Sequence, residues 1–201
     1  FLHSNGGDGV VPWRLVTLLR EHCDRLGVLV PFRAFSAATL TALGADEIVM
    51  HPMGMLGPTD PTVSNAFNPR DAAGNGLGIG VEDVAAFLAI ARDDLGLSQE
   101  GQAKTLELLA AQVHPLALGN AKRSQAQSRM MAQKMLSLHM DTERDRTVME
   151  TIVDSLTSKL YYHGHPINRN EARTLGLKVS ADSENEVLTS LMWDLYLDYE
   201  R

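Results

Sequence analysis

The first sixty residues alternate between short apolar runs and helical patterns. Residues 28–30 and 48–50 are continuous apolar runs, as expected of strands that are buried on both faces of a parallel sheet. Between them the sequence predicts a helix of small residues from Ser36 to Leu43, which ends at Gly44. Strands that alternate with helices in this way imply right-handed crossovers and therefore an α/β fold with a parallel sheet.

A further helix is predicted ahead of these strands. Pro12 suits its first turn, and Gly27 is in the position that usually follows a helix end. The apolar residues Val11, Leu15, Leu18 and Leu19 fall at helical spacing. Residues 1–3 resemble the tail of a buried strand, and a Gly-rich turn follows at residues 5–9. We therefore expect a fragment of a longer protein, with one or more N-terminal strands missing.

The composition and the periodicity of the sequence change twice in the middle of the chain. Residues 62–80 are rich in Gly and Asn and predict a long loop, which we expect to cover a substrate groove. Residues 81–160 show helical periodicity over most of their length, including an apolar face around residues 106–113 and a long helix at about 116–138. We expect a single domain over residues 1–201, in which the helical region 81–160 is an added layer on a core of repeated β-α units.

The C-terminal region predicts two more helices. Asn168 and Glu171 have the spacing of a capping box for a short helix that ends at Gly176. The last helix is expected to bury an apolar face made of Val187, Leu191 and Leu195.

Composition narrows the class of protein. Apolar residues make up 44% of the 201 residues, which is enough for a real core, but no window approaches the roughly 20 apolar residues of a membrane-spanning helix. The net charge of −7 argues against nucleic acid or an anionic membrane as the main partner. Cys23 is the single cysteine, so no disulfide forms within the chain. We expect a cytoplasmic protein, with membrane association only through segments outside this chain.

One serine stands where catalytic chemistry is easily built. Ser36 follows a short apolar run and starts the small-residue helix, so its hydroxyl can be exposed beside a free backbone N–H. The Gly6-Gly7 turn frees further N–H groups, and the N–H of Ala37 is favoured by the helix dipole. These three residues are the predicted oxyanion hole.

The residues alone leave the general base open. His163 and His165 lie in a loop that is free to approach a site, whereas His51 directly ends a strand and ranks second. Lys104 or Lys122 would serve in a Ser-Lys enzyme. A metal at the His-x-His pair is not expected, because no third ligand is spaced with it.

Three parts of the chain resemble the serine dehydrogenase proteinase family, a set of Clp-fold serine peptidases in the Clp/crotonase superfamily. Residues 2–7 are similar to the family's His-Thr-Pro-Gly-Gly turn. Residues 34–61 are similar to its Ala-x-Ser-x-Gly-Thr, Ala-Asp-Glu-Ile-x-Met and Leu-Gly-Pro-x-Asp-Pro motifs, and residues 163–177 to its His-x-x-Pro-Ile and Glu-Ala-x-x-Leu-Gly-Leu motifs. Ala38 replaces a family Gly, and Asn5 replaces a family Pro.

The resemblance implies a Clp/crotonase-like fold and a serine peptidase that hydrolyses peptide bonds. It implies Ser36 as nucleophile, Asp60 as the residue that orients the base, and His163 as the base. This chain order of Ser, Asp and His differs from the Ser, His, Asp order of the Clp proteolytic subunit. The resemblance requires no cofactor or metal, and it implies a peptide or protein substrate and a homo-oligomer.

Three alternatives accompany this reading. The first is a Ser-Lys protease similar to the signal-peptide peptidases. The second is a crotonase-type acyl-CoA enzyme that uses the same oxyanion hole. The third is a catalytically inactive Clp-fold subunit that binds a membrane partner. The sequence favours a peptidase, because the acyl-CoA lyases do not need a serine at position 36.

Overall fold

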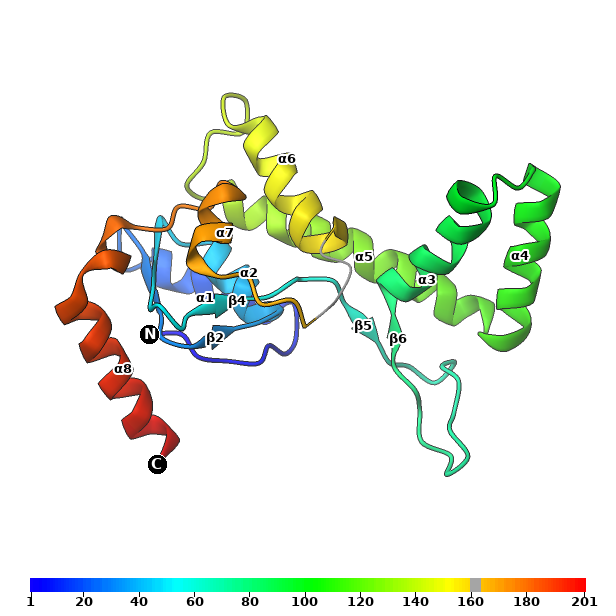
Figure 1. Cartoon of the computed structure of the whole chain (residues 1–201), viewed down its shortest axis with the longest axis horizontal. Helices are drawn as coiled ribbons and strands as arrows, with labels where there is room; N and C mark the ends of the chain where they lie inside the picture. The colour runs from blue at the N-terminus through cyan, green and yellow to red at the C-terminus, as the bar shows by residue number, and fades with distance from the viewer. Residues whose placement is uncertain (160–163) are drawn as a thin grey trace. The chain divides into compact units, whose positions relative to one another are not determined.

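The computed structural model describes residues 1–159 and 164–201, which form two compact units (Figure 1). Unit 1 consists of Phe1–Thr59 and Ser128–Arg201, and unit 2 consists of Asp60–Gln127. In Figure 1 the blue and cyan N-terminal segments of unit 1 accordingly lie together with its yellow, orange and red C-terminal helices. The expected single domain with a helical layer at 81–160 stays a prediction.

The described residues of unit 1 form four short strands and most of the helices. Its strands are β1 (Gly27–Val30), β2 (Arg33–Ala34), β3 (Glu47–Met50) and β4 (Met55–Leu56). Its helices are α1 (Val11–Arg20), α2 (Ala37–Leu43), α6 (Arg146–Asp154), α7 (Arg169–Thr174) and α8 (Glu186–Glu200), with the short helical turns η2 (Ser155–Lys159) and η3 (Ala181–Glu184). Helix α5 (Pro115–Leu136) begins in unit 2 and ends in unit 1.

The strands pair in parallel, as the apolar runs predict. β1 pairs with β3, with Val28 opposite Ile48, and β2 pairs with β4, with Ala34 opposite Leu56. The predicted helix between the first pair is also confirmed, because α2 runs from Ala37 and is followed by Gly44. These elements support an α/β fold. The Clp/crotonase-like architecture stays a prediction, since strands of this length do not define it.

Four chain segments line up through hydrogen bonds in what we call the central ladder. Ser4 pairs with Ala34 in parallel, Ala34 pairs with Leu56 in parallel, and Leu56 pairs with Ile167 in antiparallel fashion. Leu56 and Ile167 exchange both backbone bonds, at 3.0 and 2.9 Å between N and O. The ladder therefore joins the N-terminus of the chain to the segment just before α7.

The core of unit 1 lies between these strands and helices α2, α5 and α6. Val30, Leu56, Leu136, Ile152 and Ile167 are each at most 1% exposed and belong to one cluster of buried apolar side chains. Burying a side chain of this size is worth about 1.5–3 kcal/mol. The burial of this cluster therefore holds the central ladder against these helices.

One prediction about α1 is wrong, namely that Gly27 ends it. The helix ends at Arg20, and Gly27 starts β1 instead of following the helix. Arg20 bends back to the carboxylate of Asp46 at 3.1 Å, and the same carboxylate accepts the N–H of Leu26 at 2.7 Å. The connection is therefore held by these bonds and not by a helix cap. The buried residues of α1 are Pro12 and Val16, and the apolar residues at helical spacing, Val11, Leu15, Leu18 and Leu19, are exposed.

The predicted buried face of α8 is also wrong. Val187, Leu191 and Leu195 are 72%, 61% and 44% exposed, and the buried side chains are Thr189, Met192 and Tyr196. The reason is an aromatic cluster that sets the orientation of α8: the Tyr196 ring lies 5.4 Å from Phe32 and 5.1 Å from Trp193 between centroids. Aromatic packing of this kind adds to the burial energy.

The short helix α7 begins as predicted. The side chain of Asn168 accepts the N–H groups of Asn170 and Glu171 at 2.9 and 3.0 Å, and Gly176 follows the helix with a φ of 97°. The box is half formed, because the Glu171 carboxylate binds another partner, described below.

Unit 2 is built from a hairpin and helices. Strands β5 (Thr62–Val63) and β6 (Ile79–Gly80) pair in antiparallel fashion, and α3 (Val81–Ala89), η1 (Ile90–Asp94) and α4 (Gln99–Gln112) follow before α5. The predicted loop at 62–80 is thus closed at its base by a hairpin. The side-chain amide of Asn68 donates to the carbonyls of Val63 and Leu77, both at 2.7 Å.

Unit 2 buries little. Its apolar cluster consists of Val63, Val81 and Ala121, and α4 has no buried residue, so the apolar face predicted around 106–113 is not buried. Within the described ranges, none of the helices is both long enough and apolar enough to cross a membrane.

Candidate active site

Ser36 stands at a sharp turn from β2 into α2. It is the N-cap of α2 with φ 53° and ψ −114°, and it is the one non-glycine residue with positive φ in the described parts of the chain. Such a conformation costs an L-residue about 1–3 kcal/mol, and strain of this kind clusters at functional sites. A strained serine between a strand and a helix is the arrangement of a nucleophile elbow.

A buried threonine holds this turn in place. The hydroxyl of Thr39, which is fully buried, lies 2.7 Å from the carbonyl oxygen of Ala34 and 2.8 Å from that of Gly57. It also accepts the N–H of Gly57 at 3.1 Å. One side chain thus ties α2 to β2, which leads into Ser36, and to the segment that follows β4.

The predicted glycine turn packs directly against the serine. Gly6 has a φ of +107°, and a Cβ at this position would lie 2.9 Å from the Cβ of Ser36 and 3.0 Å from the carbonyl oxygen of Phe35. No side chain fits there without a shift of the serine turn. The residue type at position 6 therefore sets the shape of the site.

The three predicted oxyanion donors are not equivalent. The N–H of Gly6 already donates to the hydroxyl of Ser4 at 3.1 Å, so this donor is engaged within the turn. Gly7 and Ala37 remain, and among the described residues neither N–H has an acceptor. The N–H of Ala37 is one of those at the start of a helix that have no partner inside the helix.

The central ladder brings a histidine to the same edge of the sheet as Ser36. Gly6, Ser36 and Pro58 each follow their ladder residue by two positions, at the carboxyl ends of three parallel segments. The fourth segment runs the opposite way, so the residue at this edge is the one two positions before Ile167, which is His165. His165 is thus on the fourth segment of the ladder, and the segment of Leu56 lies between it and the strand that leads into Ser36.

His165 is paired with a carboxylate. Its Nε2 lies 2.8 Å from Oε1 of Glu171, and the two side chains are 36% and 31% exposed. Glu171 is in the first turn of α7, whose backbone Asn168 caps. Sequence reasoning assigned Glu171 to a capping box and missed this pair. The spacing of His165 and Glu171 across a predicted helix start is the signal that could have found it.

The two other members of the predicted triad lie outside the described residues of unit 1. Asp60 is the first residue of unit 2 and is 7% exposed, and Ser36 belongs to unit 1, so each is described within its own unit. His163 lies outside the described residues. The roles of Asp60 and His163 therefore stay predictions.

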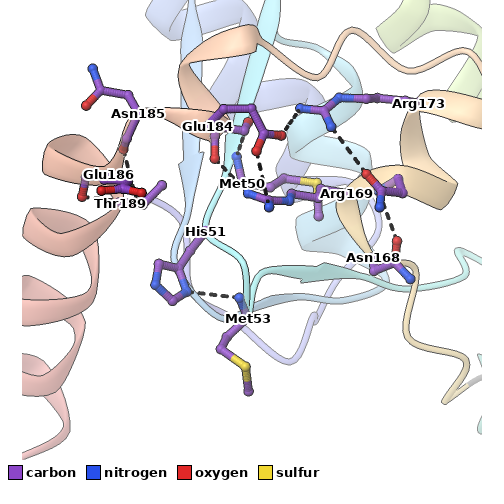
Figure 2. A network of polar contacts seen from close by, with 12 residues as sticks. Met50, His51, Met53, Asn168, Arg169, Arg173, Glu184, Asn185, Glu186 and Thr189 are labelled. Atoms are coloured by element: carbon purple, nitrogen blue, oxygen red, sulfur yellow. Dashed lines mark hydrogen bonds and ion pairs between the residues drawn. The ribbon is translucent and has the colours of Figure 1, made fainter.

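His51, the second-ranked base, has a packing role. Its Nδ1 accepts the N–H of Met53 at 3.0 Å, a bond that Figure 2 shows. The ring stacks on Trp193 at 4.7 Å between centroids. Burial, and secondarily the positive charge of Arg169, lower the pKa of His51 below its ordinary value.

The two lysines of the Ser-Lys alternative lie on exposed helix surface in unit 2. Lys104 forms an ion pair with Glu100 one helical turn away at 2.9 Å, and Lys122 donates to Gln125 at 3.2 Å. Neither is buried, and desolvation is what turns a lysine into a base. Within residues 1–159 and 164–201, no three His, Cys, Asp or Glu side chains are grouped as metal ligands.

Comparison with known proteins bears on this region of the chain. Residues 1–71 match the family described as ClpP-like SDH-type serine proteinase. This confirms the resemblance for the part of the chain that contains the glycine turn, Ser36 and Asp60, and it indicates a serine proteinase at the level of the family.

The chain is also similar to two longer archaeal proteins. The uncharacterized protein MJ1495 of Methanocaldococcus jannaschii is 25% identical over 187 residues, which cover 92% of this chain and 53% of the relative. The uncharacterized protein MJ0137 of the same organism is 26% identical over 197 residues, which cover 97% and 57%. The chain thus spans about half the length of the curated relatives it matches. No solved structure matches the chain.

Proposed function

We propose that this chain is a serine peptidase in which Ser36 is the nucleophile. The observation that carries the proposal is the strained conformation of Ser36, φ 53° and ψ −114°, on a turn from strand to helix. It is supported by Gly6, whose missing side chain makes room for the serine, and by the match of residues 1–71 to a serine proteinase family. A strained backbone conformation persists only where the surrounding structure holds it, and such strain is concentrated at functional sites.

The chemistry follows from the groups at the sheet edge. The Oγ of Ser36 forms a bond to the carbonyl carbon of the substrate while its proton passes to a histidine of the segment 163–165. The negative oxygen of the tetrahedral intermediate accepts hydrogen bonds from the N–H groups of Gly7 and Ala37. The histidine returns the proton to the departing amine, and water then releases the acyl group from Ser36 by the same two steps. This scheme uses neither a metal nor a cofactor.

The resemblance implies His163 as this base and Asp60 as the residue that orients it, with Ser36 as the first member of the triad. The burial of Asp60, at 7% exposed, supports a role for its carboxylate, because a carboxylate is rarely kept inside a protein unless it is paired. We further propose, from the same resemblance, that the substrate is a peptide or protein and that the chain acts as a cytoplasmic homo-oligomer.

Hydrolysis of an unfolded protein substrate tests the proposal. With fluorescently labelled casein, we expect the Ser36→Ala variant to lose at least about 10³-fold of the wild-type rate, because the substitution removes the proposed nucleophilic hydroxyl. Ser64→Ala is the matched control, since Ser64 is exposed in unit 2, and it should keep the wild-type rate. Undiminished hydrolysis by Ser36→Ala would contradict the proposal.

A further inference from the structure

We infer, building on the proposed function, that Ser128 is a positioning residue for Asp60, the residue that orients the base in the proposed triad. Ser128 acts through the peptide bond that joins Thr59 to Asp60. The contacts that carry this role surround Thr59, which belongs to unit 1 and directly precedes Asp60 in the sequence.

The carbonyl of Thr59 accepts a short hydrogen bond from α5. The hydroxyl of Ser128 donates to this carbonyl oxygen at 2.6 Å, and both residues are buried. Because a peptide group is planar, the direction of the Thr59 carbonyl also sets the direction of the N–H of Asp60 and the place of its Cα. The bond from Ser128 therefore restrains the backbone from which the Asp60 side chain extends.

The other side of Thr59 is held by η2, the helical turn that comes before His163 in the sequence. The N–H of Thr59 donates to the carbonyl of Leu156 at 2.8 Å, and its hydroxyl lies 3.4 Å from the same oxygen. Leu156 is fully buried, and η2 is a short π-helical turn that ends at Lys159. Such turns occur frequently at functional sites. Thr59 thus joins the segment that leads into Asp60 to the one that precedes His163.

The residue next to Ser128 holds α5 against α6 and η2 (Figure 1). Arg129 forms an ion pair with Asp154, the last residue of α6, and it donates to the hydroxyl of Thr157 in η2 at 3.1 Å. These bonds place Ser128 beside η2 without the help of Thr59. A catalytic group needs a supporting shell of this kind to keep its productive geometry.

A second buried serine offers a matched control. The hydroxyl of Ser183 accepts the N–H of Met50 at 3.0 Å, and Ser183 is buried like Ser128. Met50 is not adjacent in the sequence to any residue of the proposed triad or oxyanion hole. Ser128→Ala and Ser183→Ala therefore both remove a buried serine hydroxyl from a backbone partner, but only the first change bears on Asp60.

The second-order rate at which a fluorophosphonate probe labels Ser36 tests this role, because labelling needs an activated serine and no particular peptide substrate. We expect Ser128→Ala to lower the rate by about 10–10²-fold, the effect of misplacing a catalytic group. Ser128→Thr, which keeps the hydroxyl, and Ser183→Ala should each stay within about threefold of wild type. If Ser128→Ala does not fold, as checked by circular dichroism, Ser128→Cys takes its place, because a thiol is a weaker donor.

A double-mutant cycle with Asp60→Asn separates positioning from a general loosening of the fold. Asp60→Asn should itself lower the labelling rate by about 10²–10⁴-fold. Adding Ser128→Ala to Asp60→Asn should then lower the rate by less than about threefold, because the carboxylate that Ser128 positions is already lost. A merely structural role of Ser128 would give the same loss in both backgrounds.

Equal losses from Ser128→Ala in the wild-type and Asp60→Asn backgrounds would overturn the inference, and so would labelling of Ser128→Ala at the wild-type rate. Normal labelling of Asp60→Asn would also overturn it while leaving Ser36 as the nucleophile. A wild-type protein that is not labelled at Ser36 would overturn the proposed function together with the inference.

Discussion

The two units of this chain differ sharply in how much they bury. Unit 1 has one continuous cluster of apolar side chains from strands and helices at both ends of its sequence. Unit 2 has a cluster of three small or medium side chains, and it leaves Phe67, Leu77, Phe87, Ile90, Leu95, Leu106, Leu108 and Leu116 exposed. This difference indicates that unit 1 is the better place for a strained backbone conformation, because strain persists only where close packing prevents its relaxation.

The strained serine accordingly lies over the dense core. Every residue of α2 is buried, and Thr39 joins that helix to two segments of the sheet. In unit 2 the hairpin is instead closed by single polar side chains such as Asn68. Regions with few buried apolar contacts open locally at low free energy, which suits them to contact with partners better than to a fixed catalytic geometry.

The largest expected effect comes from truncating one leucine in each unit. Leu136→Ala, at a position 1% exposed in unit 1, should lower the free energy of unfolding by about 2–5 kcal/mol through lost burial and the cavity left behind. Leu108→Ala, at a position 68% exposed in unit 2, should change it by less than about 0.5 kcal/mol. Urea titration followed by circular dichroism measures the free energy of unfolding of both variants. Equal losses of stability in the two variants would contradict the difference in burial between the units.

A somewhat smaller effect is expected from the threonine that supports the serine turn. Thr39→Val keeps the shape but leaves the N–H of Gly57 and two buried carbonyls without this partner, at a cost of about 2 kcal/mol. Thr39→Ser keeps the hydroxyl and loses one methyl group, which should cost about 1 kcal/mol. The same urea titration compares them. A Val variant as stable as wild type would mean that the hydroxyl does not hold the turn.

The strain at Ser36 predicts a gain in stability when it is removed. Ser36→Gly should raise the free energy of unfolding by about 1 kcal/mol, because glycine adopts positive φ without a Cβ clash. Ser36→Ala keeps the Cβ and should leave stability nearly unchanged. Comparing the two variants therefore separates the effect of backbone strain on stability from the effect of the hydroxyl group. Thermal unfolding of the pair decides the point, and a destabilised Gly variant would argue that the turn is not strained.

The smallest expected effect is a pH dependence from His139. Its Nε2 lies 2.8 Å from the carbonyl oxygen of Leu43, and burial lowers the pKa of the ring below its ordinary value of 6.5. A depressed histidine pKa means that the unfolded chain binds the proton more tightly. Its neutral form therefore favours folding above about pH 6.5, and stability falls as the pH drops below that value.

This contribution is measured by urea titration at pH 7.5 and 5.5 in wild type and His139→Gln. The variant should lose part of the fall in stability between the two pH values. An unchanged slope would mean that His139 does not titrate with folding.

The local elements of the site could be predicted from the sequence because short-range patterns determine them. The apolar runs of β1 and β3 and the small residues between Ser36 and Gly44 are readable without knowledge of the fold. The positive φ of Ser36 is not, because the segments packed around this turn, such as Gly6 and Gly57, come from distant parts of the sequence.

Long-range packing explains the predictions that failed. The buried face of α8 is set by Phe32, more than 150 residues earlier in the chain, and periodicity within the helix cannot contain that information. The pair of His165 and Glu171 was missed for a similar reason: Glu171 also fits a local capping pattern, and the sequence does not show which partner prevails.

The identity of the nucleophile is the central claim, and one measurement tests it most directly. The protein is treated with a fluorophosphonate probe alongside a known serine hydrolase, digested, and mapped by mass spectrometry. We predict a phosphonate adduct on Ser36 and on no other serine of the chain. An adduct confined to another residue, or no adduct while the control hydrolase is fully labelled, would contradict it.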